Sequence, residues 1–151
     1  MTNTASVVVR PLRRTDKEQW VALWTAYLAF YETSRPREIF DLYFERLLGD
    51  DPQDFNGLVA EVNGELVGLT HYLFHRHGWS EANTCYLQDL YANPDVRGKG
   101  IGRALIEAVY EASDAAGIAT VYWLTQDFNA EARRLYDRIG VKTPFIKYAR
   151  A

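Results

Sequence analysis

The sequence predicts one domain of mixed α/β or α+β type, spanning residues 1–151. Its length is that of a single domain, and no linker rich in Pro, Gly or Ser divides it. Hydrophobic residues form 48% of the chain, which is enough for a packed core. Strand-like and helix-like segments follow one another in the order β-α-α-β-β-β-α-β-α-β, which is the pattern of a mixed domain.

The first half of the chain predicts a strand, two helices and a hairpin. Residues 7–10 are rich in Val and predict the first strand. Thr15 and Glu18 have the spacing of a capping box, which would open a helix running to about Tyr31. A second helix is expected at 37–48. Asn63-Gly64 lies between strands expected at 58–62 and 65–74, and it is a strong hairpin signal because both residues tolerate positive φ.

The second half predicts alternating strands and helices. Apolar residues at i, i+3 and i+4 spacing predict a long amphipathic helix, with Gly117 at its C-terminal end. Asn129 is a good N-cap for the last helix, and Gly140 would end it. The expected elements are a strand at 84–91, a helix from 101 to about 117, a strand at 119–125 buried on both faces, a helix at 129–140 and a short strand at 145–148.

Composition excludes several classes of function. Twenty acidic residues against seventeen basic ones give a net charge of -3, so we expect no nucleic-acid partner. The single cysteine, Cys85, excludes an internal disulfide and a Cys-based zinc site. Residues 20–31 form the longest nearly apolar stretch, which is too short for a bilayer that needs about 20 helical residues. With no signal peptide at the N-terminus, we expect a cytoplasmic protein without a membrane partner.

A glycine-rich loop at the start of the long helix is the segment with the clearest chemical meaning. Its sequence, RGKGIG at 97–102, places three glycines within five residues. Uncovered N–H groups and the helix dipole make such a start a natural site for a phosphate. A dinucleotide fingerprint would need glycine at Arg103, and a Walker A loop would need Ser or Thr at Gly100. Both nucleotide motifs therefore fail, and a plain glycine-rich turn is the structural alternative.

The loop resembles the [Q/R]-x-x-G-x-[G/A] signature of the GCN5-related N-acetyltransferases (GNAT), with Arg97, Gly100 and Gly102 as the matching residues. The resemblance continues through the preceding strand, the helix to Gly117, the strand VYWLT and the N-x-x-A-x-x-x-Y pattern at 129–140. The polyamine, thialysine and histone acetyltransferase-like members are most similar. The resemblance implies a single GNAT domain with a mixed, mostly antiparallel sheet, helices on both faces, and strands splayed at the acetyl-CoA site.

The resemblance also implies acetyl-CoA as acetyl donor. In the family, the loop amides bind the pyrophosphate, and the pantetheine arm pairs with the preceding strand. A bulge in that strand would aim one amide, that of Leu90, at the thioester carbonyl. The implied cofactor-binding residues are Leu90, Tyr91, Ala92, Arg97, Gly98, Lys99, Gly100, Ile101, Gly102, Arg103, Asn129 and Tyr136.

Three residues are the candidates for catalysis: Tyr136, Asp89 and Gln88. Tyr136 matches the tyrosine that protonates the leaving CoA thiolate, although a tyrosine beside Leu135 also fits a core position. Gln88 stands where the polyamine enzymes carry Glu, and Gln cannot accept a proton. Asp89 matches a substrate-contacting acid and could serve as the base; a water relay to another carboxylate and direct uptake of the neutral amine are the alternatives.

Aromatic residues and histidines supply further candidates. Trp20, Trp24, Tyr27 and Tyr31 share one helix face; the two tryptophans are expected in the core, and the two tyrosines could line an amine pocket together with Asp89. Three histidines, His71, His75 and His77, alternate along a predicted strand. No carboxylate or cysteine joins them at ligand spacing, so we expect no metal, and a single one as proton acceptor is the better interpretation.

The function expected from these residues is acetyl transfer from acetyl-CoA to a primary amine of a small molecule, such as a polyamine or an amino acid. A protein lysine or N-terminal amine is the alternative acceptor. A CoA-binding sensor with little turnover is the alternative class, because Gln88 departs from the family pattern. The run at 143–148 would leave an apolar strand edge if unpaired, and many relatives form homodimers through their C-terminal strands, so we expect a homodimer.

Overall fold

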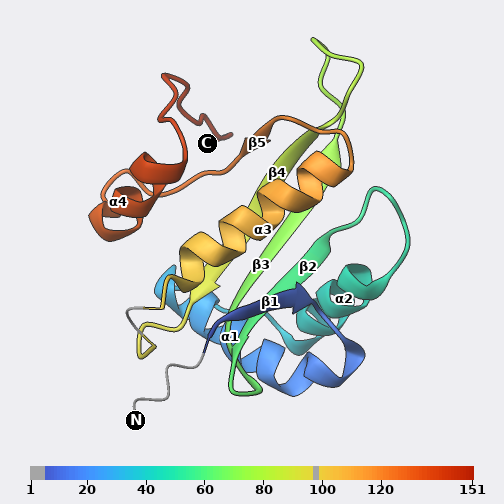
Figure 1. Cartoon of the computed structure of the whole chain (residues 1–151), viewed down its shortest axis with the longest axis vertical. Helices are drawn as coiled ribbons and strands as arrows, with labels where there is room; N and C mark the ends of the chain where they lie inside the picture. The colour runs from blue at the N-terminus through green and yellow to red at the C-terminus, as the bar shows by residue number, and fades with distance from the viewer. Residues whose placement is uncertain (1–5, 97–98) are drawn as a thin grey trace.

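A five-stranded sheet forms the centre of the computed structural model, which describes residues 6–96 and 99–151 (Figure 1). Its strands, in spatial order, are β1 (Val8–Pro11), β2 (Asn56–Val62), β3 (Glu65–His75), β4 (Thr84–Ala92) and β5 (Val121–Tyr122). Neighbouring strands are antiparallel except for β4 and β5, which are parallel. The predicted mixed, mostly antiparallel sheet is therefore confirmed.

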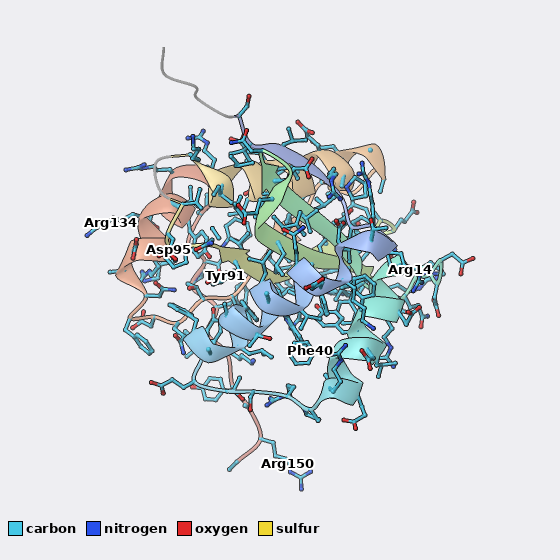
Figure 2. The ribbon with its side chains drawn as sticks, turned by 90° about the horizontal axis from the view of Figure 1, so that it is seen from below. Arg14, Phe40, Tyr91, Asp95, Arg134 and Arg150 are labelled. Atoms are coloured by element: carbon cyan, nitrogen blue, oxygen red, sulfur yellow. The ribbon has the colours of Figure 1, made fainter. Side chains whose placement is uncertain are left out.

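Helices cover both faces of this sheet. They are α1 (Lys17–Phe30), α2 (Arg37–Leu48), α3 (Ile101–Ala115) and α4 (Ala130–Ile139), and a short 3-10 turn, η1 (Arg14–Asp16), precedes α1. Figure 2 shows the strands between α3 on one side and α1 with α2 on the other. The expected layering is confirmed. No helix in the two described segments is long and apolar enough to cross a membrane, and the cytoplasmic location stays a prediction.

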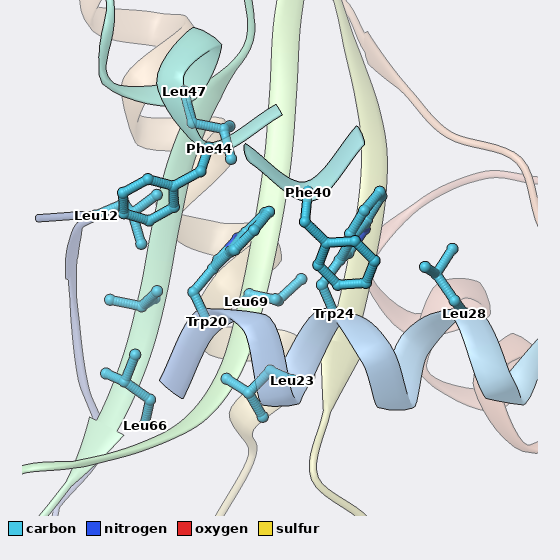
Figure 3. Packing of buried hydrophobic residues seen from close by; sticks show 11 residues of the cluster. Leu12, Trp20, Leu23, Trp24, Leu28, Phe40, Phe44, Leu47, Leu66 and Leu69 are labelled. Carbon is cyan, nitrogen blue, oxygen red and sulfur yellow. The ribbon is translucent and has the colours of Figure 1, made fainter. Parts of the chain in front are cut away.

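An aromatic core joins α1 and α2 to the sheet (Figure 3). Trp20 and Trp24 lie one turn apart on α1, and their rings stack with centroids 5.5 Å apart. Phe40 and Phe44 of α2 pack against the indole of Trp20. Trp20 and Phe44 have no exposed surface, so the core position predicted for the tryptophans is confirmed. Such large buried rings supply much of the hydrophobic stabilisation of a small domain.

Two backbone features shape the hairpin of β2 and β3: its turn, and a glycine on β3 that lets α3 pack closely. The turn between β2 and β3 has positive φ at Asn63 (53°) and Gly64 (78°), which confirms the predicted hairpin. On β3, a Cβ at Gly68 would lie 2.8 Å from Cγ2 of Ile101 and 3.0 Å from the carbonyl oxygen of Tyr91. Gly68 is thus required for close packing of the first turn of α3 against β3 and β4.

The start of α1 differs from the prediction. The helix begins at Lys17, and no side chain caps it. The carboxylate of Asp16 instead accepts hydrogen bonds from the backbone N–H of Arg13 (2.7 Å) and from both Nη atoms of Arg10 (2.8 and 2.9 Å). The capping box at Thr15 and Glu18 is therefore wrong, because a bidentate Arg10–Asp16 pair fixes this corner more strongly than a hydroxyl cap.

Replacing Asp16 by asparagine should lower the free energy of unfolding by about 2 kcal/mol at neutral pH, because the half-buried Arg10 guanidinium loses its bidentate charged partner and keeps only the longer contact with Glu61. The hydrogen bond from Arg10 holds the pKa of Asp16 below its ordinary value. The stabilisation is then complete above the unfolded pKa of about 4 and is lost as the pH falls through the folded pKa. Urea unfolding at pH 7 and pH 3 measures both effects. Asp41→Asn, which breaks two ion pairs at the surface, with Lys17 and Arg37, is the control and should change stability little.

The C-terminal part of the chain departs furthest from the prediction. The strand expected at 119–125 is reduced to Val121–Tyr122, and the side chains of Tyr122 and Leu124 are 41% and 51% exposed. The burial predicted on both faces is wrong, because β5 lies at the sheet edge and pairs with β4 alone. The strand expected at 145–148 is also absent from the described residues, where 141–151 has no regular structure. A strand forms only where a neighbour accepts its hydrogen bonds.

Candidate active site

Two of the predicted site residues lie at an irregularity in β4. His71 of β3 pairs with Asp89 of β4. The next residue of β3, Tyr72, pairs with Leu87, so that Gln88 is an extra residue on β4. This is a β-bulge, a feature that redirects side chains. Consecutive residues of a regular strand point to opposite faces of the sheet, but at the bulge Gln88 and Asp89 both line one pocket.

The pocket at the bulge has a volume of about 240 Å³. It is lined by Trp24, Ile39, Leu42, Tyr43, Arg46, Phe55, Gln88 and Asp89. Most of this wall is apolar, and the two charges on it are the carboxylate of Asp89 and the guanidinium of Arg46. Apolar walls with a few polar groups are typical of small-molecule sites.

Asp89 is buried, with 5% of its surface exposed, and several donors surround its carboxylate. One oxygen, Oδ2, accepts from the hydroxyl of Tyr43 (2.5 Å) and lies 2.8 Å from Nδ1 of His71. The phenol of Tyr27 lies close to the same carboxylate and helps to lower its pKa. These side chains come from α1, α2 and β3, so three elements distant in sequence build the environment of one carboxylate.

These contacts determine the charge of Asp89. Burial by itself would raise the pKa of Asp89, because a charged carboxylate is poorly solvated in the interior. The hydrogen bond from His71, the positive charge that His71 carries when it is protonated, and the phenols of Tyr43 and Tyr27 act in the opposite direction and outweigh that effect, so the pKa of Asp89 lies below its ordinary value. Asp89 is therefore an anion at neutral pH. A carboxylate in this condition binds a cation well and removes a proton poorly.

Tyr31 connects this region to Tyr136. The rings of Tyr27 and Tyr31 meet edge to face with centroids 5.1 Å apart. Burial and the charge of Asp89 raise the pKa of Tyr31. Burial and Tyr31 in turn raise the pKa of Tyr136 to about 12. The structure thus brings the predicted residues Tyr27, Tyr31, Asp89 and Tyr136 into one region, and the phenol of Tyr136 stays protonated at neutral pH.

Tyr136 also has a packing role. It lies on α4, and its ring meets that of Trp123 edge to face at 5.5 Å. Gly140, which ends α4, approaches the same indole so closely that a Cβ there would lie 2.9 Å from it. The side chain is half-buried rather than enclosed. Both sequence interpretations of Tyr136, core aromatic and proton donor, are compatible with this position.

The start of α3 has the features expected of an anion site. Gly100 is the N-cap residue with φ of 65°, a left-handed conformation that favours glycine. Within the described residues, no side chain caps this helix and no acidic residue lies in its first turn. The first N–H groups are thus open to a ligand, and the helix dipole favours an anion. Arg97 and Gly98, two predicted loop residues, lie outside the described residues.

The edge of β4 next to this loop is also open. β4 extends to Ala92, but β5 pairs only with Cys85 and Tyr86. From Leu87 onward, no strand in the described part of the chain covers the outer edge of β4. The unpaired edge includes Leu90, Tyr91 and Ala92, and an extended ligand can pair with such an edge. The residues present therefore fit a long cofactor with a phosphate group at one end.

Comparison with known proteins decides the family. Residues 20–141 match the acetyltransferase (GNAT) family. The chain belongs to this family. The GNAT domain is 34% identical over 145 residues to the D-amino-acid N-acetyltransferase HPA3 of Saccharomyces cerevisiae, covering 95% of this chain and 90% of HPA3.

Two further comparisons place the GNAT domain among enzymes of the same type. It is 34% identical over 102 residues to a thialysine N-epsilon-acetyltransferase of Sus scrofa, which covers 62% of this chain and 59% of that protein. The structure of the aminoglycoside N-acetyltransferase AAC(6')-Iy in complex with CoA matches the fold with a TM-score of 0.86 at 17% identity, over 100% of this chain and 98% of that one. The predictions of a GNAT fold and of an N-acetyltransferase are confirmed.

The remaining predicted residues of this GNAT domain are spread around the loop and α4. Ile101 is buried against the sheet, whereas Arg103 is exposed and pairs with Glu107 at 2.8 Å. Oδ1 of Asn129 accepts from the N–H of Ala132 at 3.3 Å, which confirms its capping role in α4. Its role toward the cofactor stays a prediction.

Two residues of the acidic site, by which we mean the Asp89 carboxylate and the side chains that contact it, were missed or undervalued by the sequence analysis. No sequence pattern indicates Tyr43, because it lies 46 residues away from Asp89 in the chain. The hairpin pattern does indicate His71, since it lies on the strand next to Asp89: the register of the hairpin near its turn would pair His71 with Gln88, and the bulge moves its partner to Asp89. The other histidines lie apart, with Nε2 of His75 at 2.7 Å from the hydroxyl of Tyr122. Among residues 6–96 and 99–151, no group of three or more His, Cys, Asp or Glu is arranged for a metal.

Proposed function

We propose that the GNAT domain transfers the acetyl group of acetyl-CoA to the primary amine of a small molecule, with an amino acid as the preferred acceptor. The observation that carries the proposal is the anionic, buried Asp89 on the wall of the small pocket. An ammonium group is the ligand that such a carboxylate attracts. Arg46 on the same wall would attract a carboxylate, so the pocket suits an acceptor that carries both charges.

The relatives support this choice of acceptor. One is named for D-amino acids and another for thialysine, and both names denote small molecules with an amine and a carboxylate. A polyamine has no group for Arg46. A protein lysine or N-terminal amine would have to bring a peptide backbone into a pocket of about 240 Å³. We therefore rank these two acceptor classes below amino acids.

Acetyl-CoA would supply the acetyl group as a thioester. The open N–H groups of Gly100, Ile101 and Gly102 would bind its pyrophosphate, together with the loop residues Arg97, Gly98, Lys99 and Arg103. The open edge of β4 at Leu90, Tyr91 and Ala92 would hold the extended arm, with Asn129 and Tyr136 on the other side. The N–H of Leu90 next to the bulge would stabilise negative charge on the thioester oxygen.

The chain's own side chains would then orient the amine and move protons. Asp89 would bind the ammonium group and place the nitrogen for attack. The nitrogen must lose a proton before it attacks, and the low pKa of Asp89 makes uptake of the neutral amine, or relay through water, a better route than direct transfer to Asp89. Gln88 would orient the amine by hydrogen bonding. The phenol of Tyr136 would protonate the departing thiolate.

Thiol release from acetyl-CoA tests the proposal across amino acids, polyamines, amino sugars and lysine peptides. We expect the highest kcat/KM with an amino acid, and a value at least about tenfold lower for the same compound without its carboxylate, because one charged contact is worth about 1.5 kcal/mol or more. A rate with lysine peptides alone would make the protein a protein acetyltransferase. No release with any amine would leave a CoA-binding sensor.

We also propose that the chain acts as a homodimer. Four large apolar residues near the C-terminus, Val141, Phe145, Ile146 and Tyr148, are 77% to 89% exposed. Soluble monomers rarely expose so much apolar surface in one short segment. A second copy of the chain would cover this segment and pair with its extended backbone.

Light scattering at micromolar concentration tests the dimer. We expect a mass of twice 17.3 kDa for the full chain and a monomer after removal of residues 141–151. The matched control removes residues 1–5 and should leave the dimer intact. A monomeric full chain would contradict the proposal.

A further inference from the structure

A chain of hydrogen bonds runs from the core to the acidic site. The indole N–H of Trp20 donates to Nε2 of His71 at 3.0 Å. On the other side of the imidazole, Nδ1 lies 2.8 Å from Oδ2 of Asp89. All three side chains are buried, with 0%, 1% and 5% of the residue exposed. Because the three groups are buried, water does not compete for these hydrogen bonds.

The chemistry of the partners determines which imidazole nitrogen carries the proton. An indole N–H can only donate, so Nε2 of His71 must be an acceptor without a hydrogen. The single proton of the neutral ring then lies on Nδ1, where it is donated to Asp89. A doubly protonated His71 would point an N–H at the N–H of Trp20, and burial leaves neither group another partner.

The neutral state of His71 has a consequence for the charge of the pocket. An imidazolium beside Asp89 would form an ion pair and cancel its charge. A neutral His71 donates a hydrogen bond to Asp89 but does not compensate its negative charge. Among the described residues, the other titratable side chains close to Asp89 are tyrosines, which burial and Asp89 keep protonated: Tyr27 of α1, Tyr31 directly after α1, Tyr43 of α2 and Tyr86 of β4. The cation on the pocket wall, Arg46, faces Asp54 at 3.9 Å.

We propose that Trp20 and His71 are positioning residues of the acceptor site: Trp20 holds His71 as the neutral Nδ1–H form, and His71 holds Asp89 as an uncompensated, fixed anion for the ammonium group of the acceptor. The part concerning the acceptor rests on the proposed function. The hydrogen-bonded chain itself does not, so the two parts can be tested apart.

The first test measures the protonation of His71 by the ¹⁵N chemical shifts of its ring. In the wild-type protein at pH 7 we expect a protonated Nδ1 and an unprotonated, hydrogen-bonded Nε2. Trp20→Phe removes the donor, and we expect the ¹⁵N shift of Nε2 to move at the same pH, because this nitrogen loses its hydrogen bond. Trp24→Phe is the matched control, since it removes the same atoms from the adjacent stacked ring, whose N–H has no acceptor among the described residues.

The outcomes of this test are decisive without any activity measurement. A proton on Nε2 of wild-type His71 at neutral pH would overturn the proposal. So would equal behaviour of the Trp20→Phe and Trp24→Phe proteins. Both variants leave a similar cavity, so loss of packing alone predicts no difference between them.

The second test separates the hydrogen bond of His71 from its bulk. In His71→Asn the amide nitrogen takes the place of Nδ1 and can still donate to Asp89, whereas His71→Leu has no donor. We expect the KM for the acceptor to stay within about threefold in the Asn variant and to rise at least about tenfold in the Leu variant. The kcat and the KM for acetyl-CoA should change little in both.

Equal KM values for the acceptor in the Asn and Leu variants would overturn the positioning role. A wild-type protein that acetylates no amine would instead overturn the proposed function, and the ring shifts of His71 would still decide whether Asp89 is held as inferred. If His71→Leu does not fold, the KM for the acceptor is compared between Trp20→Phe and the wild-type protein: it should rise in the variant, and an unchanged value would overturn the positioning role.

Discussion

Asp89→Asn is expected to raise the KM for the acceptor amine by about 10²-fold. The variant removes the anion that pairs with the ammonium group, and loss of one partner of a buried charge pair costs about 3 kcal/mol. The fold should survive, because Oδ1 of the new amide can still accept from His71 and Tyr43, and its NH₂ group can donate to the hydroxyl of Tyr27.

The pH dependence sharpens this expectation. Because the pKa of Asp89 lies below its ordinary value, Asp89 stays ionised between pH 6 and pH 9. In this range, kcat/KM of the wild-type enzyme should rise with pH only as the acceptor itself loses its proton. Steady-state kinetics in both substrates measures the effect, with Asp50→Asn as an exposed control of the same chemical change. An unchanged KM for the amine in Asp89→Asn would remove Asp89 from the acceptor site.

Tyr136→Phe is expected to lower kcat by about 10²-fold. General acids contribute about 10²- to 10⁴-fold, and a thiolate is a good leaving group, so the low end applies. The pKa of about 12 means that Tyr136 carries its proton throughout the assay range, and no loss of activity from its ionisation is expected below about pH 11. Phenylalanine fills the same space against Trp123, so the affinity for CoA should be retained.

The control for Tyr136→Phe is Tyr110→Phe. The hydroxyl of Tyr110 donates to the carbonyl oxygen of Ile139 at 2.7 Å and so ties α3 to the end of α4. Its loss would test whether a small displacement of α4 is enough to lower the rate. We expect a modest loss of stability and nearly unchanged kcat. Equal losses of activity in the two variants would show that Tyr136 acts through the packing of α4 and donates no proton.

Features that depend only on neighbouring residues could be predicted from the sequence. The Asn63-Gly64 turn, the helix at 37–48 and the cap at Asn129 all appear as expected, since turn conformation, helical periodicity and capping involve only a few adjacent residues. The RGKGIG motif is also a local sequence pattern, and it indicates the GNAT family without reference to the fold.

Which elements find hydrogen-bonding partners depends on how the whole chain packs. The extent of β5 and the missing strand at 145–148 depend on whether a neighbouring strand is present, which no local pattern encodes. The capping box at Thr15 failed for the same reason, since Arg10 reaches Asp16 from another element.

The acidic site shows the same division most clearly. The sequence indicated Asp89 as a site residue. The charge of its carboxylate and the direction of its side chain depend on hydrogen-bond donors that are distant in the chain, His71 by 18 residues and Tyr43 by 46 residues. Trp20, read from the sequence as a core residue, is also the donor that sets the proton on His71. Long-range contacts of this kind form only when the sheet and helices pack together, because burial brings the groups into contact and excludes the water that would otherwise compete for them.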